Sequence, residues 1–208
     1  MIDLKEFAMQ PISLILASGS PRRHELLTQL GFQVQKQPAD IDETRQNGEV
    51  PEDYVARLAV EKNRVVAAQS PDMPVVSADT CVVLSDEILG KPESPEHARQ
   101  MLRQLSGQTH RVLTGVCVSL GGRTVHCVQV NEVRFKPLSE EEIAAYLSTG
   151  EPFDKAGGYG IQGIAGCFVA HLSGSFTGVM GLPVFETVQL LQQCGIALPD
   201  ILAQHAVK

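Results

Sequence analysis

The chain contains apolar runs typical of buried strands, and these alternate with apolar positions at helical spacing. Apolar or alternating runs predict strands over residues 12–17, 74–84, 88–89, 112–120, 124–135, 168–172 and 177–181. Helical spacing, with capping residues included, predicts helices over residues 20–31, 51–69, 94–107, 139–150 and 183–193. Because hairpins are mixed with strand–helix crossovers, this order predicts an α/β fold: a single domain with a mixed central β-sheet flanked by helices.

Residues at the ends of the predicted helices support these assignments. Ser20 followed by Pro21 is typical of a helix start, and Gly31 is a plausible residue to end that helix. Ser139 followed by Glu142 forms a capping box. The acidic run 139–142 is therefore assigned to a helix start and not to a metal site.

Two adjacent arginines, Arg22 and Arg23, fall in the first turn of a helix that directly follows a strand. Cations at that position oppose the helix dipole, so helix stability does not account for them. Free backbone N–H groups in the same turn, together with Gly19, favour a cradle for an anion. The alternative is that both arginines are ordinary solvated surface residues.

Two further charged residues lie within apolar patterns. Lys62 lies inside the apolar stripe of the helix over 51–69, where it either snorkels to the edge of the stripe or reaches into a ligand cleft. Asp79 stands in the middle of the strand over 74–84, where an unpaired carboxylate costs several kcal/mol. Asp79 is expected to meet a cation, a metal or water in a cleft, with a purely structural ion pair as the alternative. Lys91 follows the return strand, near the same end of the sheet.

Composition narrows the class of protein. The chain has 208 residues of which 43% are apolar, enough for one substantial core, and no apolar run is long enough to span a membrane. Scattered cysteines and histidines, without CxxC or HExxH, predict neither a disulfide framework nor a zinc site. A net charge of −7 argues against nucleic acid as a partner but not against a small anion. We expect a cytoplasmic protein with no membrane partner.

Four motifs in order resemble the Maf family, also called septum formation proteins: "LASGSPRR", "SADT" followed by "GKP", "DKAGGYGIQG" and "GLP". The resemblance covers residues 12–195 and leaves an N-terminal extension, 1–11, and a C-terminal tail, 196–208. It implies a single α/β unit with a central cleft, related to the inosine triphosphate pyrophosphatases. The activity it implies is that of a nucleoside triphosphate pyrophosphatase, which cleaves between the α and β phosphates with Mg²⁺ or Mn²⁺ as cofactor.

The resemblance also implies roles for individual residues. The phosphate-binding positions are matched by Ser18, Arg22, Arg23, Lys62 and Lys91. Asp79 matches the catalytic aspartate and Glu43 an acidic position near metal and water, so both are tentative metal ligands. Whether Asp79 is a general base or a metal ligand is not decided by the sequence.

Substrate choice is the finest expectation. At the positions linked to base choice, Arg23, Thr80 and Gln162 resemble the residues of the family branch that prefers dTTP and UTP. Modified pyrimidine nucleotides are further candidate substrates. The alternatives are a 7-methyl-GTP pyrophosphatase of the same family and a non-catalytic, nucleotide-binding regulator of cell division. A pure binder has little use for Asp79 beside a polyanion, which favours an enzyme. The sequence does not set the oligomeric state, and a homodimer is among the expected assemblies.

Overall fold

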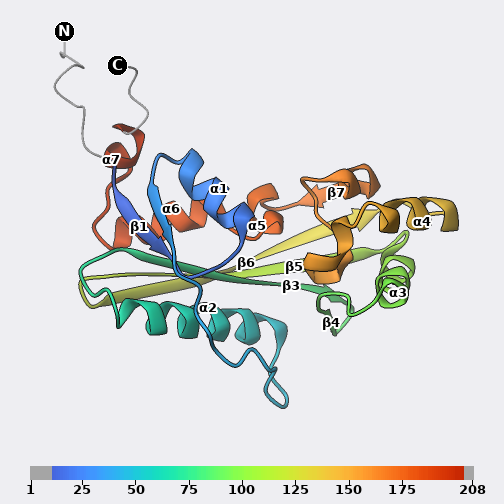
Figure 1. Cartoon of the computed structure of the whole chain (residues 1–208), viewed down its shortest axis with the longest axis horizontal. Coiled ribbons are helices and arrows are strands. Elements are labelled where there is room, and N and C mark those ends of the chain that lie inside the picture. Colours follow the sequence, from blue (N-terminus) through green and yellow to red (C-terminus); the bar gives the residue numbers. More distant parts are fainter. Residues whose placement is uncertain (1–10, 204–208) are drawn as a thin grey trace, which may run out of the picture.

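A computed structural model describes residues 11–203, and within them one mixed sheet organises the fold (Figure 1). The strand order is β2-β1-β3-β5-β6-β7, and β4 pairs with β3 beside that path. β1 runs parallel to β2 and β3, and the remaining pairs are antiparallel. The strands are β1 (Ser13–Leu16), β2 (Gln33–Lys36), β3 (Val75–Leu84), β4 (Glu87–Leu89), β5 (Thr109–Leu120), β6 (Arg123–Phe135) and β7 (Val169–Ser173). The expected mixed α/β architecture is confirmed.

Helices cover both faces of this sheet. α2 lies along one face, whereas α1, α5 and α6 lie on the opposite face, and α3 and α4 gather at one end of the molecule (Figure 1). The helices are α1 (Pro21–Gln29), α2 (Pro51–Ala67), α3 (Pro95–Leu105), α4 (Glu140–Ser148), α5 (Phe176–Met180), α6 (Val184–Gln193) and α7 (Leu198–Ala203). No helix among the described residues is both long enough and apolar enough to cross a bilayer.

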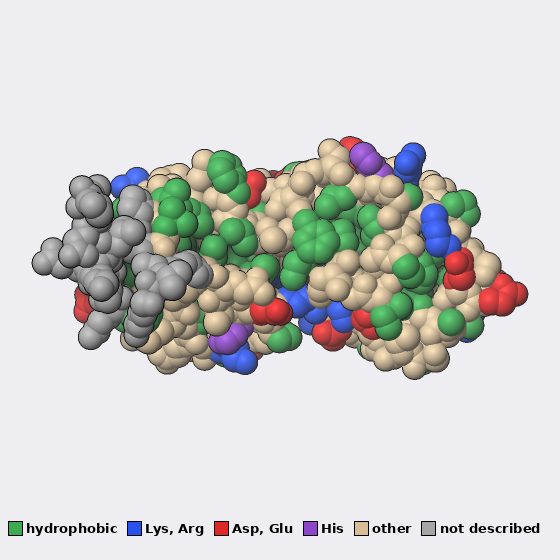
Figure 2. Space-filling view, turned by 90° about the horizontal axis from the view of Figure 1, so that it is seen from above, with side chains coloured by type: hydrophobic (Ala, Val, Ile, Leu, Met, Phe, Trp, Pro, Cys, Tyr) green, Lys and Arg blue, Asp and Glu red, His purple; other side chains and the backbone are tan. Residues whose placement is uncertain are grey.

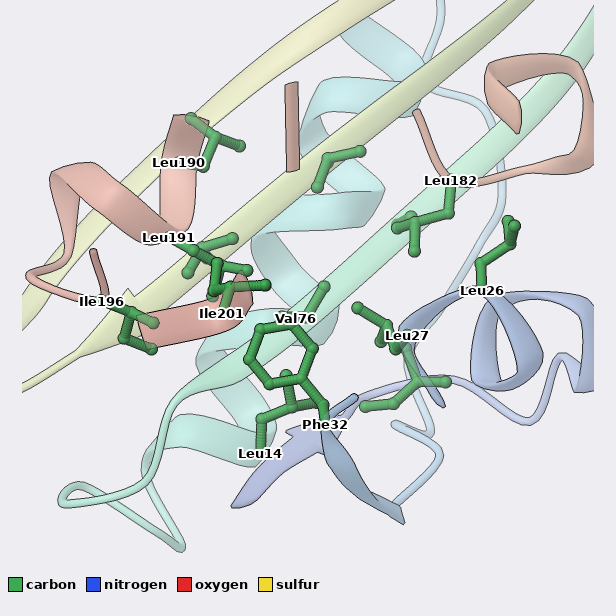
Figure 3. Packing of buried hydrophobic residues seen from close by; sticks show 14 residues of the cluster. Leu14, Leu26, Leu27, Phe32, Val76, Leu182, Leu190, Leu191, Ile196 and Ile201 are labelled. Atoms are coloured by element: carbon green, nitrogen blue, oxygen red, sulfur yellow. The ribbon is translucent and has the colours of Figure 1, made fainter. Parts of the chain in front are cut away.

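The core on the α1 and α6 side joins segments from both ends of the chain (Figure 3). Leu14 of β1 and Leu27 of α1 belong to the same buried cluster as Leu191 of α6 and Ile201 of α7. A second cluster, around Leu102 of α3, fills the other end. Residues 204–208 and 1–10, which belong to the expected tail and N-terminal extension, lie outside the described residues.

Helix α2 approaches strand β5 unusually closely at Gly115. A Cβ atom there would lie only 2.3 Å from the carbonyl oxygen of Val55, so only glycine fits. Gly115 is paired across the sheet with Asp79 of β3, and directly opposed residues point to the same face. The Asp79 side chain is therefore directed to the face that α2 covers.

Strand β3 has a stretch of open edge in its middle. On one side β1 pairs only with Val75 and Val76, and β4 pairs only from Val82 onward. Among the described residues no strand pairs with the segment 77–81 on this side. Because side chains alternate between faces along a strand, residues on both faces of β3 can be reached from this gap.

Several sequence-based expectations need correction. A strand is expected over residues 177–181, but 177–180 lie in α5, because the Ser175 hydroxyl caps the Gly178 N–H and Gly181 ends the helix at φ 113°. The glycine-rich stretch 153–166 is not a plain loop but includes short 3₁₀ turns, at Glu151–Asp154, Ala156–Gly158 and Ile164–Phe168. β2 was missed because its residues are mostly exposed and polar.

A buried histidine links β5 to the glycine-rich stretch. His110 Nε2 lies 2.7 Å from the Tyr159 hydroxyl, and its Nδ1 has no hydrogen-bond partner within the described residues. Its ring packs edge-on against Phe135. Burial lowers the pKa of His110 from 6.5 to about 4, because a charged imidazolium would be poorly solvated there.

We predict that His110 makes the fold sensitive to mild acid. Between pH 6.5 and about 4, His110 becomes protonated in the unfolded chain but stays neutral in the folded chain. The free energy of unfolding therefore decreases as the pH is lowered through this window. The loss approaches about 3 kcal/mol at the acid end and vanishes above the unfolded pKa.

Denaturant unfolding of the wild type and of His110→Gln, measured from pH 7.5 to 4, tests this prediction. Other acidic groups titrate in both proteins and cancel in the difference. Relative to wild type, the Gln variant should gain about 3 kcal/mol as the pH falls. A difference that stays constant with pH would contradict the prediction.

Candidate active site

One cavity of about 640 Å³ lies at the open edge of β3, between the end of β1 and the β3–β4 hairpin. Its walls contain all nine residues singled out from the sequence: Ser18, Arg22, Arg23, Glu43, Lys62, Asp79, Thr80, Lys91 and Gln162. Figure 2 shows basic and acidic side chains gathered near the middle of one face, between the two ends of the molecule. Segments far apart in sequence therefore meet at the edge of β3 on which none of the described strands pairs with residues 77–81.

Lys62 lies at the centre of a charged group within this cavity. Its Nζ atom is 2.7 Å from Asp79 Oδ1 and also 2.7 Å from Glu43 Oε1. Lys62 therefore reaches into the cleft, as one of the two sequence interpretations predicted. The ion pair offsets the cost of burying Asp79, whose side chain keeps 12% of its surface exposed toward the cavity. The neighbouring thiol of Cys81 has its pKa raised to about 12, mainly by burial, and so stays protonated.

The two arginines after β1 differ in their surroundings. Arg23 is held by three protein acceptors, since Nε donates to the Gly181 carbonyl, Nη1 to Ser18 Oγ and Nη2 to Thr80 Oγ1, at 2.8, 3.0 and 3.1 Å. Burial lowers the pKa of Arg23 below its usual value, opposed by the charge of Asp79. An arginine side chain held in this way has little conformational freedom left to lose when a ligand binds.

Arg22 instead belongs to an open charged network. Its Nη1 is 3.4 Å from Asp154 Oδ2, and Lys155 Nζ is 2.5 Å from Asp154 Oδ1. Burial raises the pKa of Asp154, but the hydrogen bond from Lys155 and the charges of both cations outweigh it and leave that pKa lowered. Lys155 also lines the cavity and was not singled out from the sequence. Its place as the last cation before the glycine-rich run is a signal that could have identified it.

The remaining predicted residues reach the cavity from separate elements. Thr80 lies on β3 and is half-buried, in contact with Arg23. Gln162 lies exposed on the turn before the last 3₁₀ segment, and Lys91 follows β4, also exposed. The trio expected to select the base, Arg23, Thr80 and Gln162, thus shares one cavity.

Glu43 and Asp79 are the residues whose carboxylates could coordinate a divalent cation. Both carboxylates approach one ammonium, so their oxygens lie within reach of a common positive charge. The described residues contain no cluster of three or more His, Cys, Asp or Glu suited to a metal. Two carboxylates nevertheless fit Mg²⁺ or Mn²⁺, because such ions are often bound by one or two carboxylates with waters and substrate phosphates.

The loop that carries Glu43 is anchored to α2 by Arg57. The Arg57 guanidinium contacts both carboxylate oxygens of Glu49, at 2.6 and 2.9 Å, and Nη2 donates to the Thr44 carbonyl at 3.1 Å. The hydrogen bond from Arg57 is the main cause that lowers the pKa of Glu49 to about 2. Tyr54 adds a hydrogen bond to the Glu43 carbonyl at 3.1 Å. Sequence reasoning missed Arg57, which reads as one more solvated residue of a helix.

We predict that Arg57→Ala loosens this loop. Without the guanidinium, Glu49 and the Thr44 carbonyl lose the hydrogen bonds that tie the loop to α2, so the loop opens more often and trypsin cleavage after the exposed Arg45 accelerates about tenfold. Arg64→Ala, at an exposed position of the same helix, should leave this rate unchanged. Equal cleavage rates in the Arg57→Ala variant and the wild type would mean that other contacts hold the loop.

The sequence is similar to known proteins over most of its length. The family model described as Maf-like protein matches residues 13–194. A dTTP/UTP pyrophosphatase of Neisseria gonorrhoeae is 52% identical over 194 residues, which are 90% of this chain and 96% of that protein. A dTTP/UTP pyrophosphatase of Escherichia coli O157:H7 is also 52% identical, over 86% of this chain and 91% of its own length.

A solved structure that matches this chain is much less similar to it in sequence. A HAM1 protein from Coxiella burnetii matches 60% of this chain and 73% of its own, with a TM-score of 0.44 and 16% identity. At that level the structural likeness carries no argument about function.

Proposed function

Because the chain belongs to the Maf-like protein family, we propose that it is a nucleoside triphosphate pyrophosphatase acting on dTTP and UTP. It hydrolyses the bond between the α and β phosphates and releases a nucleoside monophosphate and pyrophosphate. The observation that carries the proposal is the contact of the buried Lys62 with the buried Asp79 and the exposed Glu43 inside the 640 Å³ cavity. The identity of 52% to each of two dTTP/UTP pyrophosphatases supports it.

The charges along the cavity suit a triphosphate. Such a ligand carries close to four negative charges, and the lining contains four cations besides Arg23: Arg22, Lys62, Lys91 and Lys155. Lys62 and Arg22 are paired with carboxylates in the free protein, so the phosphates compete for cations that are already positioned. A small anionic substrate is compatible with the net charge of −7, which supports neither nucleic acid nor an anionic membrane as a partner.

Asp79 is the group we assign to the attacking water. A carboxylate with one oxygen on Lys62 keeps acceptor capacity with which to orient a water in line with the α-phosphorus and take its proton. Lys62 then faces the negative charge that develops on the phosphates. We further propose that Mg²⁺ or Mn²⁺, held by Asp79 and Glu43, offsets charge on the departing pyrophosphate when it is bound. The location we propose is cytoplasmic, where nucleoside triphosphates are made and used.

The first test is product identity. Purified protein with Mg²⁺ or Mn²⁺ and a panel of canonical and modified triphosphates should release pyrophosphate and the nucleoside monophosphate, fastest from dTTP and UTP. Orthophosphate and a nucleoside diphosphate as first products would refute cleavage between the α and β phosphates. Fastest turnover of 7-methyl-GTP would move the protein to the alternative substrate, and turnover of no triphosphate would favour a non-catalytic binder.

The second test concerns Asp79→Asn, which keeps the volume of the side chain but removes its charge. Turnover should fall by at least about a hundredfold whether Asp79 acts as base or as metal ligand. Nucleotide binding without metal should hold or tighten, because a charge that repels the phosphates has gone. Asp72→Asn, at an exposed position just before β3, is the matched control and should behave as wild type. Near-normal turnover in a folded Asp79→Asn protein would reject the catalytic role.

A further inference from the structure

Thr114 is a fully buried polar residue of β5 that the proposed chemistry does not use. It is paired with Thr80 across β3 and β5, and the two hydroxyl oxygens lie 2.9 Å apart. The Thr114 hydroxyl also donates to the Gly178 carbonyl of α5, at 2.9 Å. Since Thr80 in turn accepts from Arg23, the four groups form one hydrogen-bonded chain from the cavity to the interior.

The groups at the two ends of this series of hydrogen bonds decide the direction in which each hydroxyl donates. The Arg23 guanidinium can only donate, and the Gly178 carbonyl can only accept. Each hydroxyl between them has a single proton. The chain is therefore complete only if Arg23 donates to Thr80, Thr80 to Thr114 and Thr114 to Gly178.

Turning the Thr80 proton toward the cavity would cost a buried hydrogen bond. The single Thr114 proton could then serve either the Gly178 carbonyl or Thr80, so either the bond between the two hydroxyls or the bond to the carbonyl would be lost. The net value of one such bond corresponds to a factor of roughly ten. The orientation in which Thr80 gives its proton to Thr114 is therefore strongly favoured.

The carbonyl at the inner end is held in place by close packing. A Cβ atom at Gly178 would lie 2.4 Å from Gln129 Oε1 and 3.1 Å from Asn131 Nδ2, so α5 packs closely against side chains of β6 at this point. The Ser175 N–H is bonded to Asn131 Oδ1 at 2.6 Å, which fixes the start of the same helix. The acceptor for Thr114 is thus set by the fold and does not depend on a ligand.

We infer that Thr114 is a positioning residue that makes the Thr80 oxygen a hydrogen-bond acceptor only, and so a reader of the N–H on the edge of uracil or thymine. This inference rests on the proposed function and deepens its choice of base. Uracil and thymine present one N–H between two carbonyls, whereas cytosine has an unprotonated nitrogen at the same ring position. The oxygen of Thr80 attracts the first and repels the second, and N–H donors of Arg23 and Gln162 suit the flanking carbonyls.

The test compares kcat/KM for dTTP and dCTP in wild type and in Thr114→Val, which keeps the shape of the side chain and removes its hydroxyl. The freed Thr80 proton can then turn toward the base, so the ratio of dTTP to dCTP should fall roughly tenfold. Thr114→Ser restores the chain and should restore the ratio. Thr109→Val, at an exposed position of the same strand, should leave the ratio unchanged.

A loss of activity by one common factor for both substrates, or a ratio that stays at the wild-type value, would overturn the inference and leave the proposed function standing. A wild-type protein that shows no preference for dTTP over dCTP would instead refute the proposed base choice, and the inference with it, before any variant is made. Should Thr114→Val fail to fold, as judged by circular dichroism and thermal unfolding, Thr114→Ala carries the same expectations.

Discussion

The backbone contact between α2 and β5 at Gly115 is the constraint on which the geometry of the site depends. With no side chain at Gly115, the helix lies close enough for the Ser77 hydroxyl to bond the Ala59 carbonyl at 2.6 Å and for Asn63 to bond the Val75 carbonyl at 2.9 Å. These bonds set the position of the helix along β3 and the direction in which Lys62 points. A larger residue at Gly115 would move the helix outward and separate the Lys62 ammonium from its two carboxylates.

In the proposed complex, the two faces of strand β3 meet the two ends of a nucleotide. Asp79 and Thr80 are adjacent in sequence and so point to opposite sides of the sheet, Asp79 toward α2 and Thr80 toward α5. Both line the same cavity because the edge of β3 is open between β1 and β4. In the part of the chain that the structure describes, no strand pairs with these five residues on the side opposite β5, and this gap lets one dipeptide face both the reacting phosphates and the base in the proposed complex.

The sequence predicted the parts of this molecule whose physical signals are local. Ser20 and Ser139 cap helices as expected, and charged residues in apolar patterns, Lys62 and Asp79, do mark the cavity. What could not be predicted depends on contacts between distant segments. Thr114 reads as an ordinary strand residue, and residues 177–181 read as a strand because the cap from Ser175 and the close approach of Gly178 to the sheet leave no periodic pattern.

The cluster that joins Leu14 and Leu27 to Leu191 and Ile201 has a consequence for synthesis on the ribosome. β1 and α1 emerge well before α6 and α7, whose Leu191 and Ile201 complete the cluster around them. The turn after β1, which we propose binds phosphate, therefore rests on a core that stays incomplete until α6 and α7 have been translated. A nascent chain that has released β1 and α1 but not yet α6 and α7 exposes part of this apolar surface, and in that interval it is a suitable ligand for a chaperone at the tunnel exit.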